Sequence, residues 1–158
     1  MANTDELLAA HLKRATNLIL EDKIDDALTL LDGLHAKYPD HFGPCLLIAQ
    51  CLYKLDRYEE TSDWHNKAIK LSPSSAIVST TKFMALFGLG KIDEALDEME
   101  RFLGVGKAEA YEEELSWWLS DLKQDDEKKD IYKRVLGRVR RMAAFYPPIA
   151  KVLEQIDD

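Results

Sequence analysis

The sequence lacks the long apolar run that a membrane protein requires. None of its 158 residues belongs to a run near the roughly 20 apolar residues of a membrane-spanning helix. The apolar stretch at residues 7–10 is followed at once by His11, Lys13 and Arg14, so it is too short for the core of a signal peptide. We therefore expect no membrane association and a cytoplasmic location.

Basic residues are too few for a general nucleic-acid-binding protein. The chain has 21 Lys and Arg against 29 Asp and Glu, a net charge of −8, whereas nucleic-acid binding draws much of its affinity from neutralising phosphates. The charge is also uneven, because residues 131–151 contain six basic residues and no acidic one. We expect no nucleic-acid partner and a protein whose C-terminal part is more positive than the rest.

Cysteine and histidine are scarce and poorly spaced for chemistry. Cys45 and Cys51 are six residues apart on one predicted helix, about 240° around it, which suits neither a disulfide nor a shared metal. No two of the four histidines have the four-residue spacing that places two ligands on one helix face. No glycine-rich phosphate loop follows a strand. We therefore expect no metal, no cofactor and no catalytic residue.

What the sequence does contain is a repeat of 34 residues. Residues 23–28 (KIDDAL) return almost unchanged as residues 91–96 (KIDEAL), and Tyr58 occupies the same register midway between them. Pro39 and Pro73 keep the same spacing. A fixed period of this size indicates an architecture of stacked repeats.

Apolar residues recur at three- and four-residue spacings, the period of an α-helix. They predict three helix pairs in residues 1–107, then a degenerate fourth pair and a short capping helix in residues 108–158, packed as one domain. The fold class is thus all-α, a solenoid of helix-turn-helix repeats with C-terminal capping helices, which cover the core face of the last repeat. The last long helix should bury one stripe: Ile131, Val135, Val139, Met142 and Phe145.

These units resemble the tetratricopeptide repeat (TPR). That family has a small residue in the first helix, an apolar residue and an acid pair at the turn, an alanine opening the second helix, and a proline at its end. The matching residues here are Ala15 and Ala49; Ile24, Tyr58 and Ile92 with their acid pairs; Ala27 and Ala95; and Pro39 and Pro73. The resemblance implies that the solenoid is right-handed. Thr61 in place of alanine, and Phe83 in place of a small residue, predict an irregular superhelix.

The resemblance implies a concave groove lined by the first helix of each pair. Its expected lining is mostly apolar and aromatic: Leu12, Thr16, Leu46, Gln50, Tyr53, Thr80, Met84 and Phe87. Such a groove suits a peptide that brings hydrophobic anchors. Alternatively, these side chains pack on neighbouring helices or on the chain's own C-terminal segment.

Some family members bind the acidic tails of heat-shock chaperones through lysine, asparagine and arginine in this groove. The corresponding positions here are Leu12, Thr16, Leu47, Ile77 and Thr81. A clamp for such tails is therefore not expected.

Two C-terminal features suggest a second surface. Trp117 lies outside the apolar stripe of its helix and is expected either to be exposed, as interface tryptophans often are, or to pack against the last helix. Arg134, Arg138 and Arg141 share one helix face. They form either an acid- or phosphate-binding patch or ion pairs with nearby acids such as Glu127 and Asp130.

The sequence as a whole favours a non-enzymatic module that binds a protein or peptide partner in its groove. Its role would be that of an adaptor, a chaperone of the secretion type, or an inhibitor of the toxin-immunity type. The alternative is a structural protein whose groove is filled by its own C-terminal helices or by another subunit, as in a homodimer.

Overall fold

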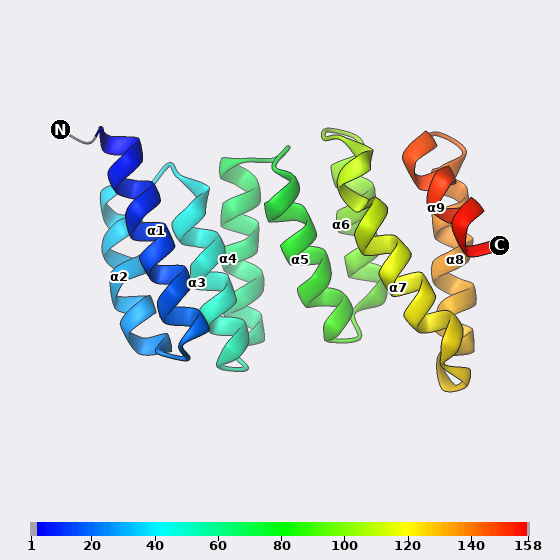
Figure 1. Ribbon diagram of the computed structural model, residues 1–158, viewed down its shortest axis with the longest axis horizontal. Helices are drawn as coiled ribbons and strands as arrows, with labels where there is room; N and C mark the ends of the chain where they lie inside the picture. The colour runs from blue at the N-terminus through cyan, green and yellow to red at the C-terminus, as the bar shows by residue number, and fades with distance from the viewer. Residues whose placement is uncertain (1–2, 158) are drawn as a thin grey trace. The chain divides into compact units, whose positions relative to one another are not determined.

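A computed structural model of the chain describes residues 3–157, and within that range it contains helices and no strand (Figure 1). The chain divides into two compact units, residues 1–73 and residues 74–158. We describe each unit by itself. The boundary expected after residue 107 lies inside the second unit.

Unit 1 consists of two helix pairs. They are α1 (Thr4–Leu20) with α2 (Ile24–Lys37), and α3 (Phe42–Lys54) with α4 (Tyr58–Leu71). Helix α1 begins with a capping box, in which the Asn3 side chain accepts from the Glu6 amide and the Glu6 carboxylate accepts from the Asn3 amide. Ala15 and Ala27 are fully buried between the helices, which explains the small residues at these repeat positions.

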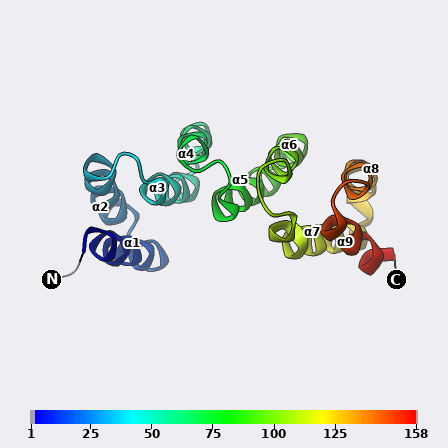
Figure 2. The same cartoon turned by 90° about the horizontal axis from the view of Figure 1, so that it is seen from above.

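Unit 2 begins with a third pair, α5 (Ala76–Gly88) and α6 (Ile92–Leu103). The short 3₁₀ helix η1 (Ala108–Tyr111) leads into α7 (Glu112–Gln124), and η2 (Asp126–Lys128) leads into α8 (Lys129–Ala143). The last helix, α9 (Pro147–Asp157), packs on both α7 and α8 and buries Ile149, Val152 and Ile156. Figure 2 shows α5 and α7 on one side of this unit and α6 and α8 on the other.

The turn inside each of the first three pairs is built in the same way. Its left-handed residue recurs with the 34-residue period: Asp22, Asp56 and Gly90 have φ of 60°, 58° and 77°. The next amide donates to a carbonyl five residues back, which is the Schellman arrangement of a helix end. These bonds are Lys23 to Leu18 at 2.8 Å, Arg57 to Leu52 at 3.0 Å, and Lys91 to Leu86 at 2.9 Å. The sequence repeat is therefore a repeat of backbone geometry.

The all-α fold of helix pairs with C-terminal helices is confirmed. The third pair ends differently from the first two, because Gly104, Val105 and Gly106 replace the proline. Gly106 lies under the Phe102 ring so closely that a Cβ atom there would come within 2.3 Å of it. Among the described helices, none combines the length and apolar character of a membrane span.

Candidate functional site

The predicted groove residues of unit 1 lie on α1 and α3 and only partly reach the surface. Gln50 is exposed, whereas Leu12, Thr16 and Tyr53 are half-buried. The Thr16 hydroxyl donates to the Leu12 carbonyl at 3.0 Å. The Tyr53 ring packs edge-on against Tyr58, with 5.5 Å between ring centres. Most of these groups therefore already have partners within unit 1.

Two of the predicted groove residues, Leu46 and Phe87, are buried. Leu46 is 7% exposed and Phe87 is 4% exposed, so we leave both out of the candidate surface. The ring centre of Trp118 on α7 lies 4.2 Å from that of Phe87. At this position the chain's own C-terminal part covers the groove residue, as the self-filled alternative expects.

In unit 2, α5 and α7 together line a pocket. Thr80 on α5 is half-buried, and its hydroxyl donates to the Ala76 carbonyl at 2.9 Å. Met84, one turn further, is 46% exposed. It borders a pocket of about 320 Å³ whose other lining residues lie on α7: Glu113, Glu114, Trp117 and Trp118.

The exposure of Trp117 follows from the register of α7. Leu115, Leu119 and Leu122 occupy the buried face of this helix, and Trp117 lies outside that stripe. It is 59% exposed, and its ring stands nearly perpendicular to that of Trp118, with 4.7 Å between centres. Trp117 also borders a second pocket of about 470 Å³, lined further by Glu112, Glu113, Ser116, Ser120 and Gln155.

The carboxylates beside Trp117 are unevenly compensated. Glu112 pairs with Lys151 at 3.1 Å, whereas Glu113 and Glu114 form no ion pair with any residue from 3 to 157. Burial raises the pKa of Glu114, and the charge of Glu113 raises it further. The surface that contains Met84 and Trp117 therefore carries negative charge that no described residue neutralises through an ion pair.

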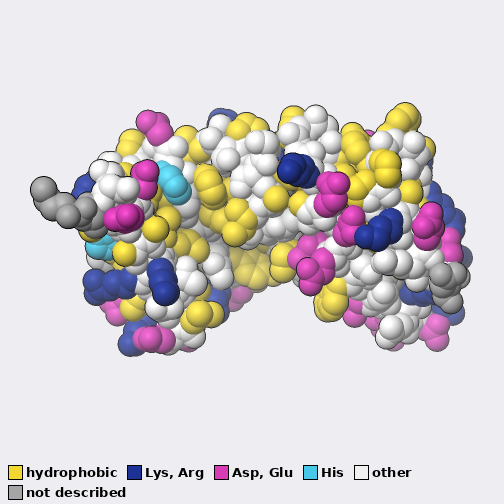
Figure 3. Space-filling model, turned by 45° about the horizontal axis from the view of Figure 1, so that its top comes forward, with side chains coloured by type: hydrophobic (Ala, Val, Ile, Leu, Met, Phe, Trp, Pro, Cys, Tyr) yellow, Lys and Arg dark blue, Asp and Glu magenta, His cyan; other side chains and the backbone are white. Residues whose placement is uncertain are grey.

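The basic face of α8 is mostly neutralised by α6. The pairs are Arg134 with Asp93 at 3.6 Å, and Arg138 with Asp97 at 2.9 Å and with Glu100 at 2.7 Å. Arg134 and Arg138 thus pair with acids other than Glu127 and Asp130, since packing of α8 on α6 brings Asp93, Asp97 and Glu100 closer. Two of the three arginines on this helix face are thus paired with acids of α6, and acidic and basic side chains are interspersed on the face of the molecule that Figure 3 shows.

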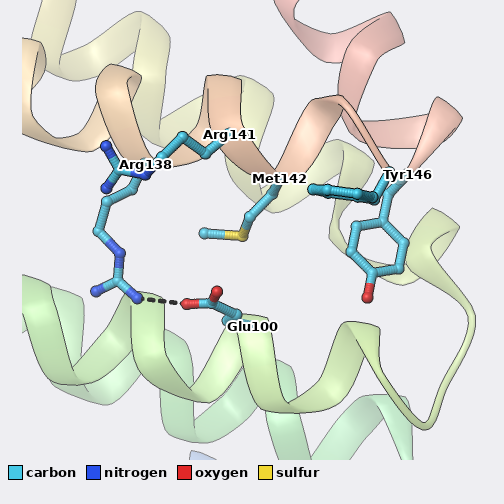
Figure 4. Close-up of a pocket in the computed structure, with 6 residues that line it drawn as sticks. Glu100, Arg138, Arg141, Met142 and Tyr146 are labelled. Carbon is cyan, nitrogen blue, oxygen red and sulfur yellow. Dashed lines mark hydrogen bonds and ion pairs between the residues drawn. The ribbon is translucent and has the colours of Figure 1, made fainter.

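The Arg141 side chain lines a separate pocket of about 250 Å³, together with Glu100, Arg138, Met142, Phe145 and Tyr146 (Figure 4). The predicted burial of Phe145 was wrong, because this residue is 81% exposed. Helix α8 ends at Ala143, so the helical spacing that placed Phe145 on the buried stripe no longer applies there. Met142 is the last buried residue of that stripe.

Unit 2 contains a buried polar network that the sequence pattern did not predict. The Ser79 hydroxyl donates to the Glu98 carboxylate at 2.7 Å and lies 2.8 Å from the Tyr111 hydroxyl. Arg101 donates to both oxygens of Glu98, at 2.9 and 2.7 Å. Burial raises the pKa of Tyr111 well above its usual range. Because its groups are mutually hydrogen-bonded, we assign the network to holding α5, α6 and η1 together.

Neither cysteine thiol is suited to act as a nucleophile. Cys45 and Cys51 are both free and buried. Burial raises the pKa of both, that of Cys51 to about 11, so that each remains a protonated thiol at neutral pH. Within residues 3–157, no three His, Cys, Asp or Glu side chains are placed to hold a metal ion.

Comparison with known proteins agrees with this architecture. A family model described as a tetratricopeptide repeat matches residues 9–41, which span α1 and α2. No curated protein sequence matches the chain.

Two solved structures of MamA, a TPR-containing protein, have a similar fold. The first, titled "MamA MSR-1 C2", has a TM-score of 0.51 and 18% identity, and the match covers 90% of this chain and 83% of that one. The second, a mutant of MamA, has a TM-score of 0.50 and 17% identity over 87% of this chain and 81% of that one. At this identity the likeness shows the fold alone. The match thus identifies a tetratricopeptide repeat in α1 and α2, and the helix pairs of the chain have a fold similar to that of a TPR-containing protein.

Proposed function

We propose that the chain binds a segment of a partner protein against the face of unit 2 that α5 and α7 form. The observation that carries this proposal is the exposure of Trp117 and Met84 beside one pocket. Burying apolar surface stabilises a protein or a complex by about 25 cal/mol per Å², and a large apolar side chain that faces water lacks this stabilisation. Exposed tryptophan next to a concave surface is typical of an interface anchor.

TPR proteins are protein-interaction modules in general, and we place this chain among them. Within that class we propose a cytoplasmic, non-catalytic adaptor, chaperone or inhibitor with a dedicated partner. The free thiols of Cys45 and Cys51 suit a reducing compartment.

A photo-cross-linking experiment tests the proposal. A photoreactive phenylalanine analogue replaces Met84 in one variant and the exposed Glu94 of α6 in a matched control. We expect position 84 to capture a specific protein that position 94 does not. With that protein purified, Met84→Asp and Trp117→Ala should each raise Kd at least about tenfold, as for interface anchors. Equal capture at both positions, or an unchanged Kd in both variants, would contradict the proposal.

Self-association is a second candidate, favoured by Phe145. This ring is 81% exposed, and it borders the pocket of Arg141 and Tyr146. If the chain forms a homodimer through this end of α8, sedimentation velocity should show a concentration-dependent dimer that Phe145→Ser abolishes. A monomer at all concentrations would exclude this role.

A further inference from the structure

We propose that the segment bound between α5 and α7 is basic, with a lysine or arginine next to an apolar side chain. This inference rests on the proposed function and adds the chemistry of the partner. The apolar side chain would enter the pocket beside Met84 and Trp118. The cation would lie over Trp117, close to Glu113 and Glu114.

Charge complementarity is the first reason. Glu113 and Glu114 border the pocket without an ion-pair partner among the described residues. An acidic segment that docked there would bring like charges together, and the repulsion would weaken its binding. A basic segment would supply the cation that the two carboxylates lack.

The geometry of the indoles is the second reason. Trp117 and Trp118 stand at 89° to each other, and Trp117 is 59% exposed. A cation over an indole ring is attracted by the negative charge of the ring face. Unit 1 contains such a pair within the chain, since the Lys67 ammonium lies 4.0 Å from the centre of the Trp64 ring. In unit 2, no cation–π contact among the described residues involves Trp117, and the proposed partner provides one.

Helix capping alone does not account for these acids. Helices α2, α4 and α6 each have two acidic residues in the first turn, where the helix dipole favours them. Helix α7 has three, and two of them border a pocket next to an exposed tryptophan. The raised pKa of Glu114 shows that its charge is poorly solvated in the free protein. A partner's cation would offset that cost on binding.

The test uses three fluorescein-labelled peptides with leucines at the same helical spacing. The remaining positions are lysine in the first peptide, glutamine in the second and glutamate in the third. Fluorescence anisotropy with the full chain should show that the lysine peptide binds at least about tenfold more tightly than the glutamate peptide. The difference should shrink when NaCl rises from about 0.05 to 0.5 M, because salt screens exposed charges.

Matched variants locate the effect. Glu113→Gln combined with Glu114→Gln should weaken binding of the lysine peptide about three- to tenfold and leave the glutamine peptide unchanged. The control, Glu59→Gln combined with Glu94→Gln, removes the same charge from the first turns of α4 and α6 and should have little effect. All four glutamates have solvent access, so each variant is expected to fold, which circular dichroism would verify.

The outcomes separate the two proposals. If all three peptides bind equally well and Trp117→Ala weakens all of them, the face binds peptides but the inference of a basic partner is wrong. If the control variant weakens the lysine peptide as much as the pocket variant does, the attraction is not local and the inference is also wrong. If no peptide binds in a manner that depends on Trp117, both the inference and the proposed binding face fail.

Discussion

The two units use the same repeat positions for different kinds of packing. In unit 2 the buried positions hold Ser79 and Glu98, with Arg101 beside them, joined by hydrogen bonds and an ion pair. Thirty-four residues earlier, unit 1 holds Cys45, Trp64 and Lys67. There the Cys45 sulfur lies 3.7 Å from a His35 nitrogen, the Trp64 ring packs edge-on against His35, and Lys67 lies over Trp64.

This difference shows which properties the repeat determines. The turn geometry recurs in both units, so the period specifies the backbone of the turns. The side chains between the helices do not recur, so each unit has its own source of stability. The surface differs as well, since Gln50 in unit 1 occupies the repeat position of Met84 in unit 2. We therefore expect the two units to respond differently to matched substitutions.

The largest difference in stability should come from Arg101 in unit 2 and Lys67 in unit 1, which occupy the same repeat position. Arg101→Ala would leave the buried Glu98 carboxylate with the Ser79 hydroxyl and with Lys82, whose ammonium is 3.9 Å away, and should lower the free energy of unfolding by about 3 kcal/mol. Lys67→Ala removes an exposed cation–π contact and should cost about 0.5 kcal/mol. Urea denaturation of both variants measures the difference. Equal losses would show that the network in unit 2 has no special role.

A smaller effect is expected where the third pair ends without a proline. Gly106→Ala would place a Cβ atom 2.3 Å from the Phe102 ring, and we expect a loss of about 2 kcal/mol from overpacking. Gly104→Ala is the matched control, because its Cβ would meet nothing closer than a backbone oxygen at 3.5 Å. Thermal denaturation should show a lower Tm for the first variant and little change for the second. If both keep the wild-type Tm, this close approach is not required.

The left-handed turn residues should respond with opposite signs in the two units. Gly90 has φ of 77° and open space around its Cβ position, so Gly90→Ala should cost about 1 kcal/mol through backbone strain alone. Asp22 holds the same conformation with a side chain, and Asp22→Gly should gain up to about 0.5 kcal/mol as strain is relieved. Urea denaturation of the two variants compares the turns. A loss of stability in Asp22→Gly would show that its side chain stabilises the turn.

The smallest effect concerns Glu114 and its dependence on pH. Because its pKa is raised in the folded state, the ionised carboxylate is unfavourable for folding at pH 7. This penalty disappears as the pH falls through the raised pKa and the group becomes neutral. Glu114→Gln should therefore stabilise the protein at pH 7, by less than about 0.5 kcal/mol since solvent screens the charge. The gain should vanish near about pH 3.

The matched control for Glu114 is Glu59→Gln in the first turn of α4, where removing a favourable dipole contact should give no gain. A gain at pH 7 in both variants would point to the net negative charge of the chain. The gain in stability would then not be specific to the pocket.

Most of the fold could be predicted because its period is local. The turns at Asp22, Asp56 and Gly90 depend on a few neighbouring residues, and these recur in the sequence. The burial of Phe145 was predicted wrongly because the spacing was extended beyond the end of α8.

The candidate site depends on contacts that no local pattern contains. The exposure of Trp117 could be predicted from the stripe of α7, whereas the pocket depends on how α5 packs against that helix. The position of Glu98 did carry a signal, since it lies three residues after Ala95 and four before Phe102, both buried. Tyr111, which hydrogen-bonds Ser79 in this network, lies beyond the repeats, so the network as a whole could not be predicted.

The most direct test of a binding face in unit 2 is an NMR titration of the full chain with the lysine–leucine peptide. The chain carries its own reporters: the Met84 methyl group and the Trp117 indole in unit 2, and the side-chain amide of Gln50 in unit 1. We predict that the Met84 and Trp117 resonances shift in a saturable way and that the Gln50 resonance does not. Shifts confined to Gln50, or no saturable shift at Met84 and Trp117, would contradict the account.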